Sequence, residues 1–215
     1  MIRILRVFLL FILFQAFIFP QHSKLFIKVD SISKYIISDR FQDLKNSHSD
    51  IELIDSMYLF ALRLNQYDIR ETLLSLTFAT LPFNNVPITT PFIGIKINYP
   101  LLSPKQNIFS QKVKKMPKTF FFDSPQTEFG DKDKLAHYFG NAFLAYSLNF
   151  LELTSIIGYF VEVFEETFRV SKIDARDIRA NHLGEIFGKQ LLKDSKALPS
   201  KLFIMYNLQN IRIRI

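Results

Sequence analysis

Two stretches of the chain carry apolar residues at intervals of three and four, which is the spacing of one face of an α-helix. Residues 49–52 form a capping box of the Ser-x-x-Glu type, and the first apolar stretch follows at 51–64. Residues 68–71 repeat this signal with Asp in the first position, and the second apolar stretch covers 69–81 until Pro82 stops it. The pattern predicts two helices that each bury a wide apolar face.

Alternation of apolar and polar residues, typical of a β-strand, occurs at 92–99 and again in the C-terminal tail, 202–215. The chain from 101 to 130 is basic and interrupted by prolines, which predicts an extended crossing loop. The three phenylalanines at 120–122 should be buried or inserted into lipid. Together with a short helix expected within 32–44, these features predict a mainly α protein. It should be a compact helical bundle with a small β element at 92–99 and 202–215.

Most of the glycines lie in a stretch that reads as three helical pieces. The first covers 131–146 and begins with aspartates, which suit the positive end of a helix. The second covers 151–168, and the third begins near Asp174. Gly184 and Gly188 form a stripe of small residues on the third piece, and such a stripe allows two helices to pack closely.

Each of these three pieces places polar residues at helical spacing, so that they share a face. If the helices pack side by side, the polar residues converge on one site. Carboxylates beside a histidine can bind a divalent metal, or a carboxylate can orient the imidazole of an acid–base pair. Lys134 or Arg169 would suit a phosphate group. The candidate catalytic residues are Asp133, Lys134, His137, Glu162, Asp177 and Asn181, and the candidate metal ligands are Asp133, His137, Glu162, Glu165 and Asp177.

Each candidate also has a structural explanation. Asp133 can cap a helix, His137 can be a satisfied core histidine, and the glutamates within 162–166 can be a solvated helix end. Asp177 and Asn181 can belong to a polar helix face. The coincidence of all these groups on three neighbouring pieces favours a shared site.

The N-terminal segment has the pattern of a secretory signal. Arg3 and Arg6 precede a mostly apolar run at 7–19, which is short for a membrane-spanning helix, and Pro20 breaks it. We expect a cleaved signal peptide, with an uncleaved anchor or a buried element as the alternatives. The protein is therefore expected to be exported, to the periplasm or to the membrane-associated cell envelope.

Composition excludes several kinds of chemistry. The chain has no cysteine, which excludes disulfides, thiolate metal sites, a cysteine nucleophile and lipid attachment through cysteine. It has 27 basic and 20 acidic side chains, and a net charge this small and scattered argues against nucleic acid as a partner. The charge is compatible with an anionic membrane surface, and a slightly basic protein surface explains it more simply. The sequence indicates no particular protein partner.

The sequence Asp-Lys-x-x-His-Tyr at 133–138 resembles the Asp-Lys-x-x-His-Phe signature of VanZ-like proteins. The resemblance continues with Glu-x-x-Glu at 162–165 and with Arg169, where the family has Glu-x-x-Gln and an arginine. It ends with Asp-x-x-Asp-x-x-x-Asn-x-x-Gly-x-x-x-Gly at 174–188, similar to the family's Asp-x-x-x-Asn-x-x-Gly-x-x-x-Gly. The YfiM-like group of envelope proteins shows a related plan. VanZ-like proteins typically cross the membrane several times. Here only 136–160 could span, and it could equally form two shorter helices that turn near 149–154, which favours the smaller YfiM-like plan.

The resemblance implies a cell-envelope context and supplies no established reaction. It covers only the VanZ/YfiM-like core at 131–192, and the residue patterns divide the rest into a signal or anchor at 1–20, a helical hairpin with a basic loop and no family resemblance at 21–130, and a strand-like tail at 193–215. We expect a membrane-associated cell-envelope protein whose polar site, with a divalent metal as one option, acts on an envelope lipid or phosphate-linked substrate. The alternative is a non-catalytic envelope scaffold or interaction protein, in which the same residues form a buried polar network.

Overall fold

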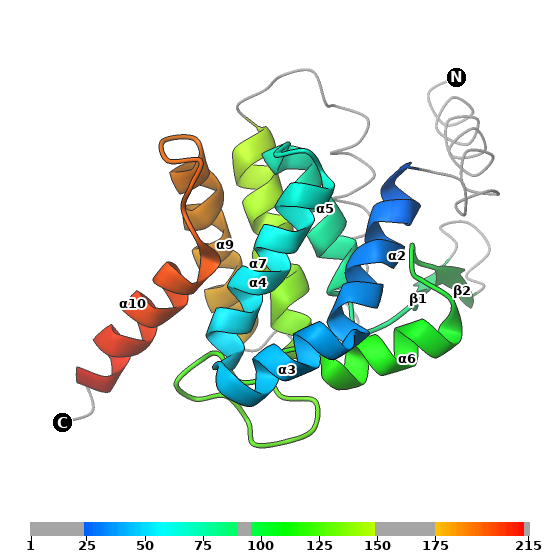
Figure 1. Cartoon of the computed structure of the whole chain (residues 1–215), viewed down its shortest axis with the longest axis horizontal. Helices are drawn as coiled ribbons and strands as arrows, with labels where there is room; N and C mark the ends of the chain where they lie inside the picture. The colour runs from blue at the N-terminus through cyan, green and yellow to red at the C-terminus, as the bar shows by residue number, and fades with distance from the viewer. Residues whose placement is uncertain (1–23, 90–95, 149–174, 213–215) are drawn as a thin grey trace.

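The computed structural model describes residues 24–89, 96–148 and 175–212, and it is mainly helical, as predicted. The N-terminal half contributes four helices that follow one another closely along the chain (Figure 1). They are α2 (Lys24–Ile37), α3 (Asp39–Ser47), α4 (Asp50–Leu64) and α5 (Ile69–Ala79).

The predicted starts of the two apolar helices are confirmed. At α4, the Ser49 side chain accepts a hydrogen bond from the backbone N–H of Glu52, and the Glu52 carboxylate accepts one from the backbone of Ser49. At α5, the Asp68 side chain accepts a hydrogen bond from the N–H of Glu71. Local side-chain chemistry therefore fixes where both helices begin.

Four further helices come from the rest of the described chain. They are α6 (Gln106–Lys115), α7 (Lys132–Ser147), α9 (Ala175–Leu191) and α10 (Pro199–Arg212). Helix α7 packs against both α5 and α9, so it joins the N-terminal helices to the C-terminal ones (Figure 1). The second predicted piece, 151–168, lies outside the described residues.

The prediction of a small β element is confirmed for its first strand and wrong for its second. Strand β2 (Lys96–Pro100) overlaps the predicted strand and pairs antiparallel with β1 (Asn85–Thr89). The C-terminal tail is instead helical through α10. Leu202, Phe203 and Tyr206 have the spacing of one helix face, and packing of that face outweighs the alternating pattern farther along.

The basic segment from 101 to 130 is only partly extended, because α6 occupies its middle. The rest crosses the end of the bundle, as predicted. Phe120 and Phe121 within it are buried, and the ring of Phe203 lies 5.2 Å from that of Phe120 and 5.7 Å from that of Phe121. Of the two predicted fates for these phenylalanines, burial in the protein is the one observed.

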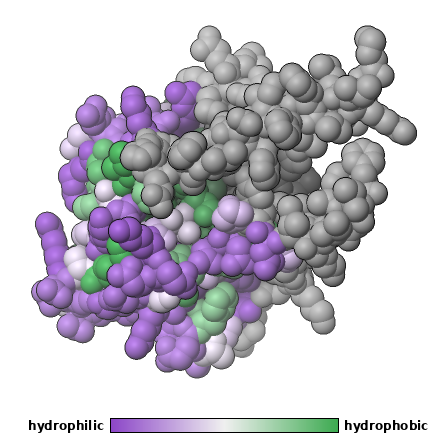
Figure 2. All heavy atoms as spheres, turned by 90° about the vertical axis from the view of Figure 1, so that its right-hand side faces the viewer, coloured by the Kyte–Doolittle hydropathy of each residue, from purple (hydrophilic) through white to green (hydrophobic). Residues whose placement is uncertain are grey.

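One hydrophobic core runs through the described part of the bundle, from Val29 on α2 to Phe203 on α10. Among the described helices, none combines the length and the apolar character needed to cross a membrane. The side of the molecule that carries α2 and α6 is mainly hydrophilic over the described residues, with small hydrophobic patches (Figure 2).

Candidate functional site

The site begins at the turn that leads into α7. Gly130 has a φ of +56°, and a Cβ placed there would lie 2.3 Å from the carbonyl oxygen of Lys118. Only glycine suits this position, because the backbone is left-handed and another backbone segment lies against it. The N–H of Asp131 then donates to that same Lys118 carbonyl at 2.8 Å, which holds the start of α7 against the crossing segment.

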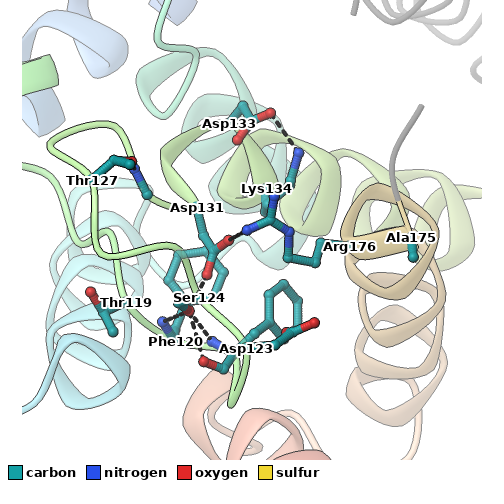
Figure 3. Close-up of polar contacts among 12 residues, drawn as sticks. Thr119, Phe120, Asp123, Ser124, Thr127, Asp131, Asp133, Lys134, Ala175 and Arg176 are labelled. Carbon is teal, nitrogen blue, oxygen red and sulfur yellow. Dashed lines mark hydrogen bonds and ion pairs between the residues drawn. The ribbon is translucent and has the colours of Figure 1, made fainter. Parts of the chain in front are cut away.

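Asp131 is fully buried and does not cap α7 with its side chain. Its carboxylate accepts a hydrogen bond from the Ser124 hydroxyl and pairs with Arg176 of α9 at 3.2 Å (Figure 3). Burial raises the pKa of Asp131, while Ser124 and Arg176 act in the opposite direction. Asp131 therefore links the crossing segment, α7 and α9, a role that its position before the helix did not indicate.

Helices α7 and α9 approach closely along the predicted glycine stripe. A Cβ at Gly184 would lie 2.1 Å from the backbone oxygen of Tyr138, and one at Gly188 would lie 2.4 Å from that of Ala142. Neither distance leaves room for a side-chain atom. The two glycines thus let the helix backbones meet and bring the polar residues near the start of α7 against those near the start of α9.

Lys134 lies between two carboxylates. Its ammonium nitrogen is 2.7 Å from Asp133 Oδ2 on the same helix and 2.7 Å from Asp177 Oδ1 on α9. The Lys134 side chain is 5% exposed and that of Asp177 is 2% exposed. Burial acts to lower the pKa of Lys134, but the hydrogen bonds and charges of the two aspartates outweigh it, so its pKa is raised. Lys134 is therefore a stable cation at neutral pH.

His137 meets α9 through both ring nitrogens. Nε2 lies 3.1 Å from Asp177 Oδ1, and Nδ1 lies 3.0 Å from Asn181 Oδ1. Asn141, one turn farther along α7, donates to the same Asn181 oxygen at 2.7 Å and to the His137 carbonyl at 3.0 Å. Asn181 Oδ1 thus acts as an acceptor, which places a proton on His137 Nδ1.

The charge of His137 depends on whether Nε2 also carries a proton. Burial lowers the pKa of His137, whereas the charge of Asp177 and the hydrogen bond to Asn181 act in the opposite direction. With one proton on Nδ1, the 3.1 Å contact between Nε2 and Asp177 Oδ1 is a hydrogen bond only when the ring carries its second proton, so the carboxylate opposes the effect of burial. Each ring nitrogen nevertheless faces a protein oxygen, so in this arrangement neither points directly at a substrate.

Five of the predicted site residues converge in this cluster: Asp133, Lys134, His137, Asp177 and Asn181. Glu162, Glu165 and Arg169 lie outside the described residues. Asn141 was not among the predicted site residues, although it follows His137 by four residues and so shares its helix face. The contacts among Ser124, Asp131 and Arg176 were not predicted either, because they join segments distant in the sequence.

The described part of the chain contains no group of three or more histidine, aspartate or glutamate side chains arranged to hold a metal ion. Among those same residues, one polar atom of the cluster lacks a hydrogen-bond partner: the buried second oxygen of Asp133. The Asp133 side chain is 17% exposed, so the cluster reaches solvent at its edge.

A separate surface cavity of about 430 Å³ lies at the other end of α7. The α4–α5 turn, from Gln66 to Arg70, lines it together with Tyr146. Tyr146 is near the last residue of α7, whereas Lys134 is in its first turn, so this cavity is distinct from the polar cluster.

No family model, curated protein or solved structure matches this chain. Functional conclusions therefore rest on the cluster itself.

Proposed function

We propose that this is a membrane-associated cell-envelope protein of the VanZ/YfiM-like type, whose polar site between α7 and α9 acts on an envelope lipid or other phosphate-linked substrate. The observation that supports it is the convergence of Asp133, Lys134, His137, Asp177 and Asn181 from two helices that were predicted to share a site. A cluster of buried titratable groups with shifted pKa values is typical of a functional site.

In this proposal, Lys134 is the group that attracts a phosphate, and Asp133 is the group that opens the site. Asp133 is more exposed than Lys134 and Asp177, so its ion pair with Lys134 is the one a ligand can reach. A phosphate oxygen that replaced the Asp133 carboxylate would meet the Lys134 ammonium while Asp177 still held it in place. A divalent metal bound by Asp133 is the other form of the proposal, with its buried free oxygen as the first ligand.

A second candidate function is the non-catalytic scaffold, and the geometry of His137 favours it. Both ring nitrogens already have partners on α9, so the ring can fix the register of the two helices without any ligand. A general base needs a nitrogen within reach of the substrate, and here one of the two contacts would have to break first.

The experiment combines ligand binding with stability on the same variants. The wild-type chain, Asp133→Asn and His137→Ala are titrated with Zn²⁺, Mg²⁺, inorganic phosphate and a short-chain phosphatidic acid by calorimetry, and each is unfolded in urea. His182→Ala is the matched control, because His182 is an exposed histidine on α9.

A functional site predicts that the wild-type chain binds one of these probes and that both site variants weaken binding about tenfold or more, a loss of about 1.4 kcal/mol. Asp133→Asn should keep most of its stability, because its carboxylate is the partly exposed member of the cluster. If no probe binds and both variants lose stability while His182→Ala does not, the scaffold is the function that remains.

A further inference from the structure

Helix α10 carries apolar residues on two sides, and only one of them is buried. On the inner side, Phe203 is fully buried, with its ring 4.7 Å from that of Tyr138. On the outer side, large apolar side chains are exposed at 45% for Ile204, 49% for Met205 and 59% for Leu208. Their spacing, i, i+1 and i+4, places these three residues on one continuous outer face.

The inner contacts hold α10 firmly, so the outer face is not exposed by a loosely attached helix. The Asp55 carboxylate of α4 accepts a hydrogen bond from the N–H of Ser200 at 2.8 Å, which caps the start of α10. The Asn207 side chain donates to the Phe120 carbonyl at 2.9 Å and accepts from the Phe122 N–H at 3.0 Å. The outer face is therefore available in the folded protein, at one edge of the bundle (Figure 1).

Basic residues precede and border this apolar face along the chain. The sequence of α10 contains no acidic residue, and residues 191–215 hold five basic side chains against one acidic side chain. Lys201 is exposed and lies three, four and seven residues before Ile204, Met205 and Leu208, so it borders their face, whereas the exposed Lys193 and Lys196 lie in the turn before α10. An exposed apolar helix face with a basic rim is the combination that places a helix in the interface of an anionic bilayer.

We propose that the outer face of α10, formed by Ile204, Met205 and Leu208 with Lys201 at its rim and Lys193 and Lys196 in the preceding turn, docks on an anionic lipid surface. The apolar side chains enter the boundary between head groups and acyl chains, and the lysines contact lipid phosphates. This inference rests on the proposed membrane association and identifies the surface responsible. It is independent of the chemistry of the α7–α9 cluster.

The absence of cysteine makes a direct test possible. Full-length Met205→Cys and Leu208→Cys variants are labelled with an environment-sensitive fluorophore, and Gln111→Cys on α6 is the control at an exposed position. Each is mixed with vesicles of phosphatidylcholine, with or without phosphatidylglycerol. The label reports only on its own position, so binding through the apolar segment at 7–19 does not imitate the result.

We expect blue-shifted, brighter emission at positions 205 and 208 with anionic vesicles, quenching by lipids that carry a quencher in the acyl chains, and no change at 111. In co-sedimentation, Leu208→Glu should weaken vesicle binding about tenfold, because a charge replaces an apolar group at the interface. Ile27→Glu is the matched control, because the exposed fraction of Ile27, 57%, is close to that of Leu208 but Ile27 lies on α2. Each Lys→Gln change at 193, 196 or 201 should weaken binding about fivefold.

Three results would overturn the inference. If vesicles bind the protein while the emission at 205 and 208 stays unchanged, another surface carries the membrane association. If the emission shifts with protein concentration alone, a second copy of the chain covers this face. If neutral and anionic vesicles bind equally, the basic rim has no role. Absence of all vesicle binding would remove the proposed membrane association as well, and would leave the ligand titrations of the α7–α9 cluster unaffected.

Discussion

Two regions of this protein bury lysines, and they do so with different partners. Between α7 and α9, Lys134 is held by two carboxylates and shares one of them with His137. Around α6, buried and half-buried lysines meet backbone carbonyls at the ends of helices. Lys112 Nζ donates to the Leu81 carbonyl at 2.6 Å, just after the end of α5, and Lys115 Nζ donates to the Ile37 carbonyl at 2.9 Å, the last residue of α2.

Lysines also donate to the backbone carbonyls at the end of α6. Lys45 donates to the Lys115 carbonyl at 3.1 Å, and Lys132 donates to the Lys114 carbonyl at 3.3 Å. The last carbonyls of a helix lack partners within the helix and carry partial negative charge, so cations stabilise them. Lysines thus cap the C-terminal ends of α2 and α6, and Lys112 binds a carbonyl just beyond α5, so folding alone explains Lys112 and Lys115 of the basic segment.

The difference teaches how to interpret a buried charge. A lysine at a helix end donates to backbone carbonyls that lack other partners. Its role is then explained by folding, without a ligand. A lysine between aspartates, beside a histidine, forms a network of titratable groups whose charges depend on one another. The α7–α9 cluster is the candidate site for this reason.

The largest effect should follow from Asp177→Ala. The change removes the carboxylate that joins Lys134 and His137 and leaves a buried cation with one partner fewer. Breaking a buried pair in this way costs about 3–5 kcal/mol. Urea unfolding measures it, with Glu185→Ala as control on the same helix, because the Glu185–Lys189 pair is exposed and worth at most about 0.5 kcal/mol. Equal losses for the two variants would mean that the buried network contributes no more than a surface pair.

Gly184→Ala tests the close contact that brings the cluster together. The new Cβ would lie 2.1 Å from the Tyr138 backbone oxygen, so α7 and α9 must separate. Overpacking of this kind costs about 1–3 kcal/mol, more than the roughly 1 kcal/mol that alanine gains over glycine within a helix. Lys189→Ala is the control, because it introduces alanine at an exposed position of the same helix, where no close helix contact is affected. A stabilised Gly184→Ala variant would show that the helices tolerate a wider spacing.

Much of the site could be predicted from the sequence because its signals are local. The four-residue spacing put Asp133 with His137 and Asp177 with Asn181, and the glycines at 184 and 188 indicated the close helix contact. The starts of α4 and α5 followed from capping residues that lie three positions apart. Periodicity and capping act within one or two turns, where sequence separation and spatial distance agree.

The rest depends on contacts between distant segments. The lysines of α6 read as a basic loop, since their partners at Leu81 and Ile37 belong to distant parts of the chain. The C-terminal tail read as a strand, because its alternation is visible in the sequence and the packing of Phe203 on Phe120 is not. Tertiary packing overrode local preference in both cases.

The pH dependence of stability distinguishes a lysine buried against backbone carbonyls, such as Lys112, from one held by carboxylates, such as Lys134. Burial lowers the pKa of Lys112 to about 7, from an ordinary value of 10.5. Between these values the unfolded chain binds more protons than the folded one, because the buried amine resists protonation. The protein therefore has its full stability with respect to Lys112 above about pH 10.5, and loses stability as pH falls towards 7. The difference in unfolding free energy between wild type and Lys112→Met should therefore rise with pH, with a slope of up to about 1.4 kcal/mol per unit.

Urea unfolding at several pH values between about 7 and 10 measures this slope. Lys114→Met is the control, because Lys114 lies on the same helix and is exposed. A flat difference for Lys112→Met would mean that the Leu81 carbonyl and the ring of Phe109, 4.7 Å away, keep the buried ammonium charged.

The smallest effect is expected for Lys115→Met, which removes the cap from the end of α2 and keeps most of the apolar stem. The Ile37 carbonyl can then accept a hydrogen bond from water instead, because the pair is only partly buried. A hydrogen bond of this kind, together with the charge at a helix C-terminus, is worth about 0.5–1 kcal/mol. Lys115→Met should therefore unfold at slightly lower urea than Lys114→Met, and the gap should narrow as salt screens the charge. If the two variants unfold at the same urea concentration, the lysine caps of this region contribute no measurable stability, and the basic segment needs another explanation, such as contact with a partner or lipid.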